Sequence, residues 1–216
     1  MVLKTFLNLP KERQKEIFLV CLEEFAYNDY ESASLSRIIK KLGLAKGSFY
    51  RYFESKKDLY IYLVEECRKI NAEELTQGYY EEGSDFFSSL MEGFVTLLKT
   101  ERKYPNYLVF SFKVSGDHRH DILGSLADKW KKERSGTIYR IISLHQEKGN
   151  LRKDIAADKI AQCVNYMILG IRQYFFGKYF PEKPDNIEKI HDLPDSVIRA
   201  EMMDFIKIMK RGIVHD

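Results

Sequence analysis

The sequence predicts an all-α fold: a three-helix head at residues 1–54, a connecting helix at 55–77 and a larger helical body at 78–216. No stretch keeps the apolar–polar alternation of a half-buried β-strand. Apolar residues recur instead at intervals of three and four, which is the period of amphipathic helices. The five prolines stand mostly between such stretches, where they suit helix ends and connections.

Composition indicates a soluble, folded protein. Hydrophobic residues make up 44% of the 216 residues and charged residues 31%, enough for a core and a solvated surface. No apolar run approaches the roughly 18 residues that span a membrane, and the first residues lack a secretory signal. The three cysteines, Cys21, Cys67 and Cys163, are odd in number and scattered, which favours reduced thiols over disulfides or a zinc site. We therefore expect a cytoplasmic protein.

Residues 34–59 carry the most specific pattern in the chain. The first part has apolar residues at i, i+3, i+4 and i+7, the stripe of a short helix: Leu35, Ile38, Ile39 and Leu42. Ser34 is the expected N-cap of this helix, with Ser32 as the alternative. Gly43 follows the last apolar residue, where a left-handed C-cap conformation would end the helix.

A second short helix would begin at Lys46 and bury Phe49 and Phe53. Helix, glycine-containing turn and short helix together are typical of a helix-turn-helix. The outward side chains suit phosphates and base edges: Lys46, Ser48, Tyr50, Arg51 and Tyr52. Between residues 36 and 57 seven cations stand against one anion, whereas the whole chain carries only +3. This concentration indicates a DNA-binding surface, although a run of Lys and Arg can also be an ordinary solvated helix face.

The run I-I-K-K-L-G-L-A-K-G-S-F-Y-R-Y-F-E-S-K-K-D-L, residues 38–59, resembles the DNA-binding domain of the TetR/AcrR family of bacterial transcriptional regulators. The family pattern is matched at Ile38, Gly43, Gly47, Tyr50, Tyr52, Phe53, Ser55, Lys56, Asp58 and Leu59. With this resemblance, the predicted DNA-binding residues are Ser34, Lys46, Gly47, Ser48, Tyr50, Arg51, Tyr52 and Lys56. The resemblance implies that Lys56 meets a phosphate. Three departures from the pattern, Ile39, Leu42 and Ala45, remove no DNA-facing group.

The segments that flank this stretch are expected to complete the head. A helix should begin near Pro10, a favourable N1 residue, and cover the helix-turn-helix with an apolar stripe: Ile17, Phe18, Cys21, Leu22 and Phe25. The residues before Pro10, including Lys4, are either a loose arm that touches the minor groove or a frayed end. Ser55 should cap the connecting helix, with Asp58 completing a capping box.

The body contains helical patterns at residues 85–103, 104–115, 119–148, 156–179 and 196–211. Gly124 and Gly136 weaken the continuity of the third pattern, which ends at Gly149. The last two patterns are apolar around more of their circumference than a surface helix. The family resemblance implies that they form a four-helix dimer interface, and a two-fold dimer suits a palindromic DNA operator. The alternative is that their stripes pack only within the chain.

A binding pocket for a small effector is also implied by the resemblance. The candidate lining is aromatic and apolar: Phe87, Met91, Phe94, Tyr107, Phe110, Trp130, Tyr139, Tyr166 and Tyr174. Polar groups that could orient an effector are Arg140, His145, Arg172 and Gln173. Aromatic and Met residues at helical spacing are more often plain core.

One cluster has metal-ligand chemistry, the run D-H-R-H-D at residues 117–121, although a polar lead-in that caps a helix explains it as well. Because no phosphate loop or nucleophile motif appears, we expect no enzyme activity and no cofactor. The sequence thus predicts a dimeric, DNA-binding transcriptional regulator, a repressor released by a small apolar or aromatic effector. The first alternative is a regulator whose body docks a protein partner. The second is a metal-dependent hydrolase built around residues 117–121.

Overall fold

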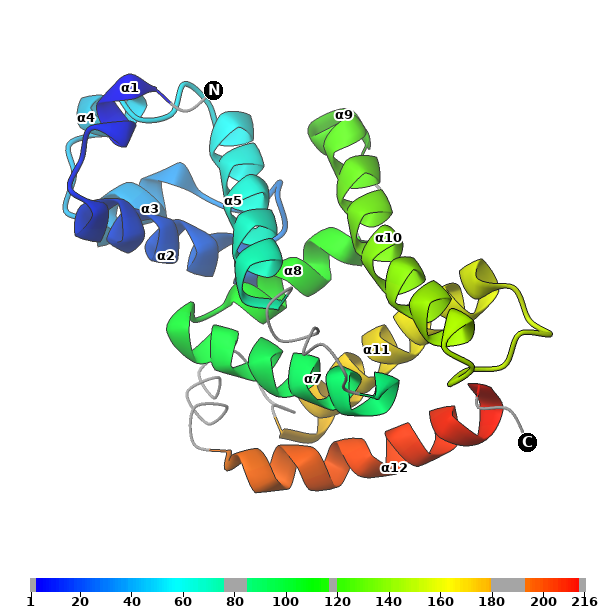
Figure 1. Ribbon diagram of the computed structural model, residues 1–216. Coiled ribbons are helices and arrows are strands. Elements are labelled where there is room, and N and C mark those ends of the chain that lie inside the picture. The colour runs from blue at the N-terminus through cyan, green and yellow to red at the C-terminus, as the bar shows by residue number, and fades with distance from the viewer. Residues whose placement is uncertain (1–2, 76–84, 117–119, 180–192, 214–216) are drawn as a thin grey trace. The chain divides into compact units, whose positions relative to one another are not determined.

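The computed structural model describes residues 3–75, 85–116, 120–179 and 193–213 (Figure 1). The regular structure within these ranges is helical and includes no β-strand, which confirms the predicted all-α fold. The chain divides into two compact units. The head unit comprises Met1–Ala72 and Lys103–Ala127, and the body unit comprises Glu73–Arg102 and Asp128–Asp216. The functional domain limits of 1–54, 55–77 and 78–216 stay a prediction.

The head unit is organised around a 17-residue helix that packs against three others. Its helices are α1 (Lys4–Leu7), α2 (Lys11–Tyr27), α3 (Leu35–Lys41), α4 (Lys46–Tyr50), α5 (Lys56–Ile70), α8 (Tyr107–Gly116) and α9 (His120–Leu123). A π-helical turn, Asn71–Leu75, follows α5. Helix α2 contacts α3, α5 and α8, and its buried stripe is the one that the sequence predicts: Ile17, Phe18, Cys21, Leu22 and Phe25. The apolar period alone was therefore enough to place this helix.

The capping signals of the helix-turn-helix are confirmed. Ser34, rather than Ser32, caps α3, because its Oγ accepts a hydrogen bond from the Arg37 amide at 3.3 Å. Gly43 follows with a φ of +63°, the left-handed conformation that glycine adopts without strain. Ser55 caps α5, and its Oγ accepts a hydrogen bond from the Asp58 amide at 3.1 Å.

Residues 3–9 differ from both predictions, because they form neither a loose arm nor a frayed end. Residues 4–7 form the helical turn α1, and the Phe6 side chain is fully buried. The Phe6 ring lies 5.0 Å from Phe53 and 5.2 Å from Tyr62, measured between ring centroids. Pro10 is then the N-cap of α2 rather than its N1 residue. Aromatic contacts with residues distant in the sequence therefore order this segment.

The body unit consists mainly of α7 (Phe86–Lys103), α10 (Ser125–Glu147), α11 (Ala157–Tyr179) and α12 (Asp195–Ile213). Rings join three of these helices: the Phe94 and Phe175 centroids are 5.4 Å apart, and those of Tyr174 and Phe205 are 5.3 Å apart. An ion pair between Arg199 and Glu92 ties α12 to α7. Helices α11 and α12 lie against each other, as Figure 1 shows in yellow and red.

The predicted helix at 119–148 is interrupted once. Gly124 has a φ of +52° and separates α9 from α10, whereas Gly136 lies inside a continuous α10. The helix ends before Gly149, which has a φ of +77°. Residues 180–192, which precede α12, lie outside the described residues. No described helix is both long and apolar enough to span a membrane.

The three cysteines lie in different environments. Cys21 and Cys67 are fully buried in the head unit, whereas Cys163 is exposed on α11. Burial raises the pKa of the Cys21 thiol far above its ordinary value, with a further contribution from the negative charge of Glu24.

Candidate nucleic-acid interface

The recognition helix of the helix-turn-helix is α4, and it is only five residues long. Its N-cap, Ala45, supplies no side-chain hydrogen bond, as the sequence indicates. A missing cap reduces helix stability by about 1 kcal/mol. Phe49 and Phe53 compensate by packing inward, and both side chains are fully buried. Tertiary packing, rather than intrinsic helix stability, therefore fixes the orientation of α4.

The residues predicted to contact DNA from α4 point outward to different degrees. Lys46, Gly47 and Arg51 are exposed, and Tyr50 exposes 40% of its surface. The side chains of Lys46 and Arg51 make no hydrogen bond or ion pair with any residue that the structure describes. Both are thus available to an external anion.

Ser48, Tyr52 and Ser34 are half-buried. Tyr52 lies edge-on to Phe6, with ring centroids 6.0 Å apart, and its carbonyl accepts a hydrogen bond from the Leu3 amide. Ser34 already uses its hydroxyl as the cap of α3. For Tyr52 and Ser34 a DNA contact would add to an existing structural role.

Two of the seven cations counted in the sequence are paired with acids on α2. Arg37 reaches Glu24 at 2.5 Å, and Lys41 reaches Glu23 at 2.5 Å. Sequence counting missed this pairing because both glutamates lie outside residues 36–57. The local positive charge is therefore smaller than the count suggests. Lys40, Lys46 and Arg51 have no ion-pair partner among the described residues.

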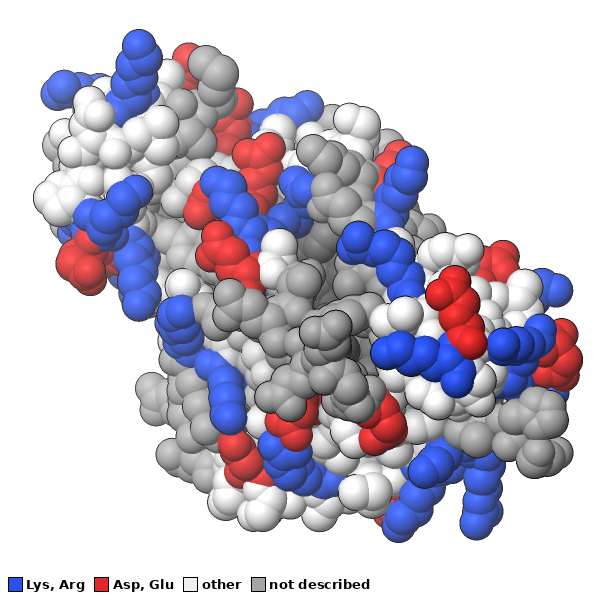
Figure 2. Space-filling model, in the orientation of Figure 1, with Lys and Arg blue, Asp and Glu red and all other residues white. Residues whose placement is uncertain are grey.

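Figure 2 shows Lys and Arg side chains projecting over the region of α1 and α4, at the upper left of the view. Elsewhere on the visible face basic and acidic side chains are interspersed.

Glu24 joins α2 to the start of α3 through several hydrogen bonds. Its Oε1 accepts from the Ser34 amide at 2.8 Å, and its two oxygens accept from Arg37 Nε at 3.0 and 3.1 Å. Arg37 Nη2 also donates to the Ser32 carbonyl at 2.9 Å. The hydrogen bonds to Glu24 raise the pKa of the Arg37 guanidinium. Arg37 therefore serves to orient α3 in this structure.

Lys56, predicted to meet a phosphate, is engaged within the head. Its Nζ donates to the Glu31 carbonyl at 2.9 Å and lies 5.0 Å from the centre of the Tyr30 ring. A phosphate at this position would have to replace the carbonyl contact. The role of Lys56 in DNA binding stays a prediction.

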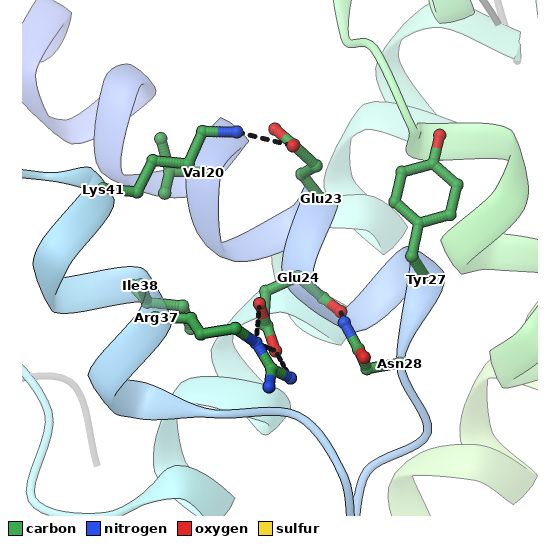
Figure 3. Close-up of a pocket in the computed structure, with 8 residues that line it drawn as sticks. All are labelled: Val20, Glu23, Glu24, Tyr27, Asn28, Arg37, Ile38 and Lys41. Atoms are coloured by element: carbon green, nitrogen blue, oxygen red, sulfur yellow. Dashed lines mark hydrogen bonds and ion pairs between the residues drawn. The ribbon is translucent and has the colours of Figure 1, made fainter. Parts of the chain in front are cut away.

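A hollow of about 200 Å³ lies between α2 and α3 (Figure 3). It is lined by Val20, Glu23, Glu24, Tyr27, Asn28, Arg37, Ile38 and Lys41. The two ion pairs described above span it, and Asn28 Nδ2 donates to the Glu24 carbonyl at 3.0 Å. Its volume is below the range usual for ligand pockets, and none of the predicted effector-pocket residues lines it.

The residues predicted to line an effector pocket have unequal environments. Phe87, Met91 and Phe94 on α7 are buried in the body unit, and Tyr107 and Phe110 on α8 are buried in the head unit. Three others expose a large part of their surface: Tyr139, Tyr166 and Tyr174. The side chain of Trp130 lies outside the described residues.

Among the polar candidates, His145 is buried, and the structure orients it. Its ring meets Phe86 edge-on at 5.8 Å, and its Nδ1 lies 3.3 Å from Asn150 Nδ2. Burial lowers the pKa of His145, and the nearby Lys148 acts in the same direction. Arg140 and Gln173 are exposed, and the Arg172 side chain is outside the described residues.

The proposed metal cluster falls largely outside the described residues. Asp117 and His118 are not described, and only the backbone of His120 and Asp121 is, at the start of α9. Within the described ranges no group of three or more His, Cys, Asp or Glu side chains is arranged to hold a metal ion.

Comparisons with known proteins agree with this architecture. Residues 19–63 match the family described as "Bacterial regulatory proteins, tetR family". An uncharacterised helix-turn-helix transcriptional regulator of Bacillus subtilis (strain 168), YdgC, is 22% identical over 170 residues, which are 76% of this chain and 81% of YdgC.

Solved structures resemble the whole chain. A TetR family transcriptional regulator from Chloroflexus aurantiacus J-10-FL is 25% identical, with complete coverage of both chains and a TM-score of 0.82. SmeT, the repressor of the Stenotrophomonas maltophilia multidrug efflux pump SmeDEF, shares the fold. It is 14% identical, covers 94% of this chain and 91% of its own, and gives a TM-score of 0.65.

A helix-turn-helix with exposed cations on its recognition helix, followed by a helical body, defines a class of transcriptional regulator. The comparisons support a TetR family regulator, as the pattern at residues 38–59 predicts. The structural similarity over the whole chain confirms the fold, and the family match at residues 19–63 agrees with a transcriptional regulator.

The difference between free and paired cations predicts a difference in salt dependence. We expect Lys46→Ala to lower the slope of log affinity against log salt by about 1, because one phosphate contact is lost. Lys41→Ala should change the slope less, because Lys41 is already paired with Glu23. DNA titrations of both variants between 50 and about 200 mM salt measure this difference. Equal slopes for the two variants would contradict it.

Proposed function

We propose that the protein is a dimeric, sequence-specific DNA-binding repressor that a small apolar or aromatic effector releases from its operator. The observation that supports DNA binding most directly is the recognition helix. Its Lys46 and Arg51 side chains are exposed and free of partners among the described residues, while Phe49 anchors the opposite face. A surface helix with this arrangement can enter the major groove.

Each predicted DNA contact has a proposed role. Lys46, Tyr50, Tyr52 and Lys56 would hold phosphates, which position the head without selecting a sequence. Arg51 and Ser48 would meet base edges, since arginine makes two parallel hydrogen bonds to guanine. At Ser34 and Gly47, near the starts of α3 and α4, the protein backbone would come close to the DNA.

Dimerisation is proposed to use α11 and α12. Both helices carry large apolar side chains on their exposed faces, including Tyr166 at 64%, Ile208 at 63% and Met203 at 45% exposure. Contiguous exposed apolar patches often mark protein–protein interfaces. A two-fold dimer would also present two recognition helices to a palindromic operator, which increases both affinity and specificity.

The proposed effector acts through differential affinity. A ligand that prefers a conformation with misplaced heads weakens DNA binding in proportion to that preference. The buried apolar residues of α7, Phe87, Met91 and Phe94, are the best-supported part of the predicted lining. We propose repression, rather than activation, by analogy with the TetR family and with SmeT, which is described as a repressor.

A second candidate keeps the DNA-binding head but lets the body dock a protein partner. The exposed side chains of Tyr139 and Tyr174 favour this alternative, since neither is enclosed within the chain. A thermal-shift screen separates the two candidates. Apolar ligands that raise the melting temperature and weaken DNA binding support an effector, whereas no response across a diverse library supports a protein partner.

Selection of bound duplexes from a random pool tests the central proposal. We expect enrichment of a palindromic site with two evenly spaced half-sites. The absence of any enriched sequence at low salt, with a stable dimer present, would contradict sequence-specific binding.

Arg51 provides a sharper test of the proposed contacts. Arg51→Ala should weaken binding to the selected site by about 1–3 kcal/mol and relax the base preference at one position of each half-site. Arg51→Lys is the matched control, since it keeps the charge but loses the paired hydrogen bonds. With Arg51→Lys, the salt dependence of binding should stay the same, whereas the base preference should still be lost. Unchanged selection by both variants would show that Arg51 does not face the bases.

A further inference from the structure

The recognition helix cannot hold its own orientation. Helix α4 has five residues and lacks a side-chain cap at Ala45. Isolated helices this short are not stable in water. The contacts that α4 and the turn after it make with the rest of the head unit therefore decide where its outward side chains point.

The N-terminal segment, residues 3–9, supplies contacts at the C-terminal end of α4. The Leu3 amide donates to the Tyr52 carbonyl at 3.0 Å. The buried Phe6 ring lies 6.0 Å from Tyr52 and 5.0 Å from Phe53. Since Tyr52 and Phe53 follow α4 within three residues, this segment fixes the turn that carries Arg51.

The same segment is anchored to the longer helices of the head unit. Gln14 Nε2 on α2 donates to the Leu7 carbonyl at 3.1 Å and to the Leu9 carbonyl at 2.7 Å. The Phe6 ring also meets Tyr62 of α5 edge-on at 5.2 Å. The segment therefore connects the end of α4 to both α2 and α5.

We infer that residues 3–9 brace the recognition helix in its DNA-reading orientation and that Phe6 is the main positioning residue. This inference rests on the proposed DNA-binding function. The family match begins at residue 19, so the brace lies outside the matched region.

The brace should affect sequence-specific binding more than general DNA binding. Paired hydrogen bonds to base edges depend on the angle and position of α4, and misalignment removes them. Attraction to phosphates is long-range and tolerates small displacements. Loosening one end of α4 should therefore lower the ratio of specific to non-specific affinity while leaving the salt slope largely unchanged.

The test compares full-length wild type and Phe6→Ala on two duplexes by fluorescence anisotropy. One duplex is selected from a random pool by the wild type, and the other is a scrambled duplex of the same composition. We expect Phe6→Ala to lower the specific to non-specific ratio at least about tenfold, the loss of one good base contact. Phe6→Leu, which keeps most of the apolar volume, should largely restore it.

Phe18→Ala is the matched control, because Phe18 is buried in the same unit and its ring contacts are with Tyr62 and Tyr104 rather than α4. It should lower stability without changing the ratio. Gln14→Ala keeps the aromatic core and should also lower the ratio of specific to non-specific affinity. It replaces Phe6→Ala as the test variant if Phe6→Ala does not fold.

The outcomes separate the brace from the proposed function. An unchanged ratio in folded Phe6→Ala and in Gln14→Ala, or an equal drop in Phe18→Ala, would overturn the positioning role alone. Failure of the wild type to select any duplex would overturn the proposed function and the brace with it.

Discussion

Ile208→Asp is expected to dissociate the proposed dimer and to reduce affinity for the selected operator at least about a hundredfold. Ile208 exposes 63% of its surface on α12, so the isolated chain has room for aspartate and should fold normally. In a two-fold interface each substitution appears twice, and each places an unpaired charge on an apolar surface. A monomer presents one recognition helix and loses half of the contacts.

Sedimentation or light scattering measures the dimer state, and operator titration measures the affinity. Lys132→Asp is the control, since Lys132 is exposed on α10 and the substitution also adds negative charge to the body unit. It should leave both measurements unchanged. A dimer that survives Ile208→Asp together with Met203→Asp would show that neither exposed flank of α12 is the interface.

Phe53→Ala is expected to destabilise the head unit by about 3–5 kcal/mol, the usual loss for removing a buried aromatic ring. The Phe53 side chain is fully buried, and its ring contacts Phe6 at 5.0 Å, Phe49 at 5.6 Å and Tyr62 at 5.3 Å. These contacts join α1, α4 and α5. Because whole proteins are stable by only about 5–15 kcal/mol, DNA binding at 37 °C should be lost as well.

Urea denaturation followed by circular dichroism measures this change in the free energy of unfolding. Phe53→Leu is the matched variant and should lose less than about 1.5 kcal/mol, since it keeps most of the apolar volume. A loss below about 1 kcal/mol for Phe53→Ala would mean that the four rings do not form a common core.

Much of the fold could be predicted because its signals are local. Ser34 and Ser55 as caps, Gly43 as a left-handed stop and the stripe of α2 each depend on residues within about one or two turns. Gly124 shows the limit of local reasoning, since it ends a helix whereas Gly136 does not. Both glycines have the same intrinsic helix propensity, so the tertiary context decides which of them ends a helix.

The features that sequence reasoning missed are contacts between distant residues. Phe6 orders α1 through Phe53 and Tyr62, which are about fifty residues away. The pairing of Arg37 with Glu24 requires knowing which faces of α2 and α3 meet. For the body, aromatic residues at helical spacing did not reveal their environment, since Phe94 is buried and Tyr166 is exposed.

The unequal burial of the cysteines makes the wild-type chain suitable for labelling without mutagenesis. A thiol-reactive dye needs an accessible thiolate, and burial denies this to Cys21 and Cys67. Cys163 stands exposed on α11, one of the two helices proposed to meet in the dimer. A fluorophore there would occupy a single defined position in each subunit. Energy transfer between donor-labelled and acceptor-labelled chains would then report the proposed dimer.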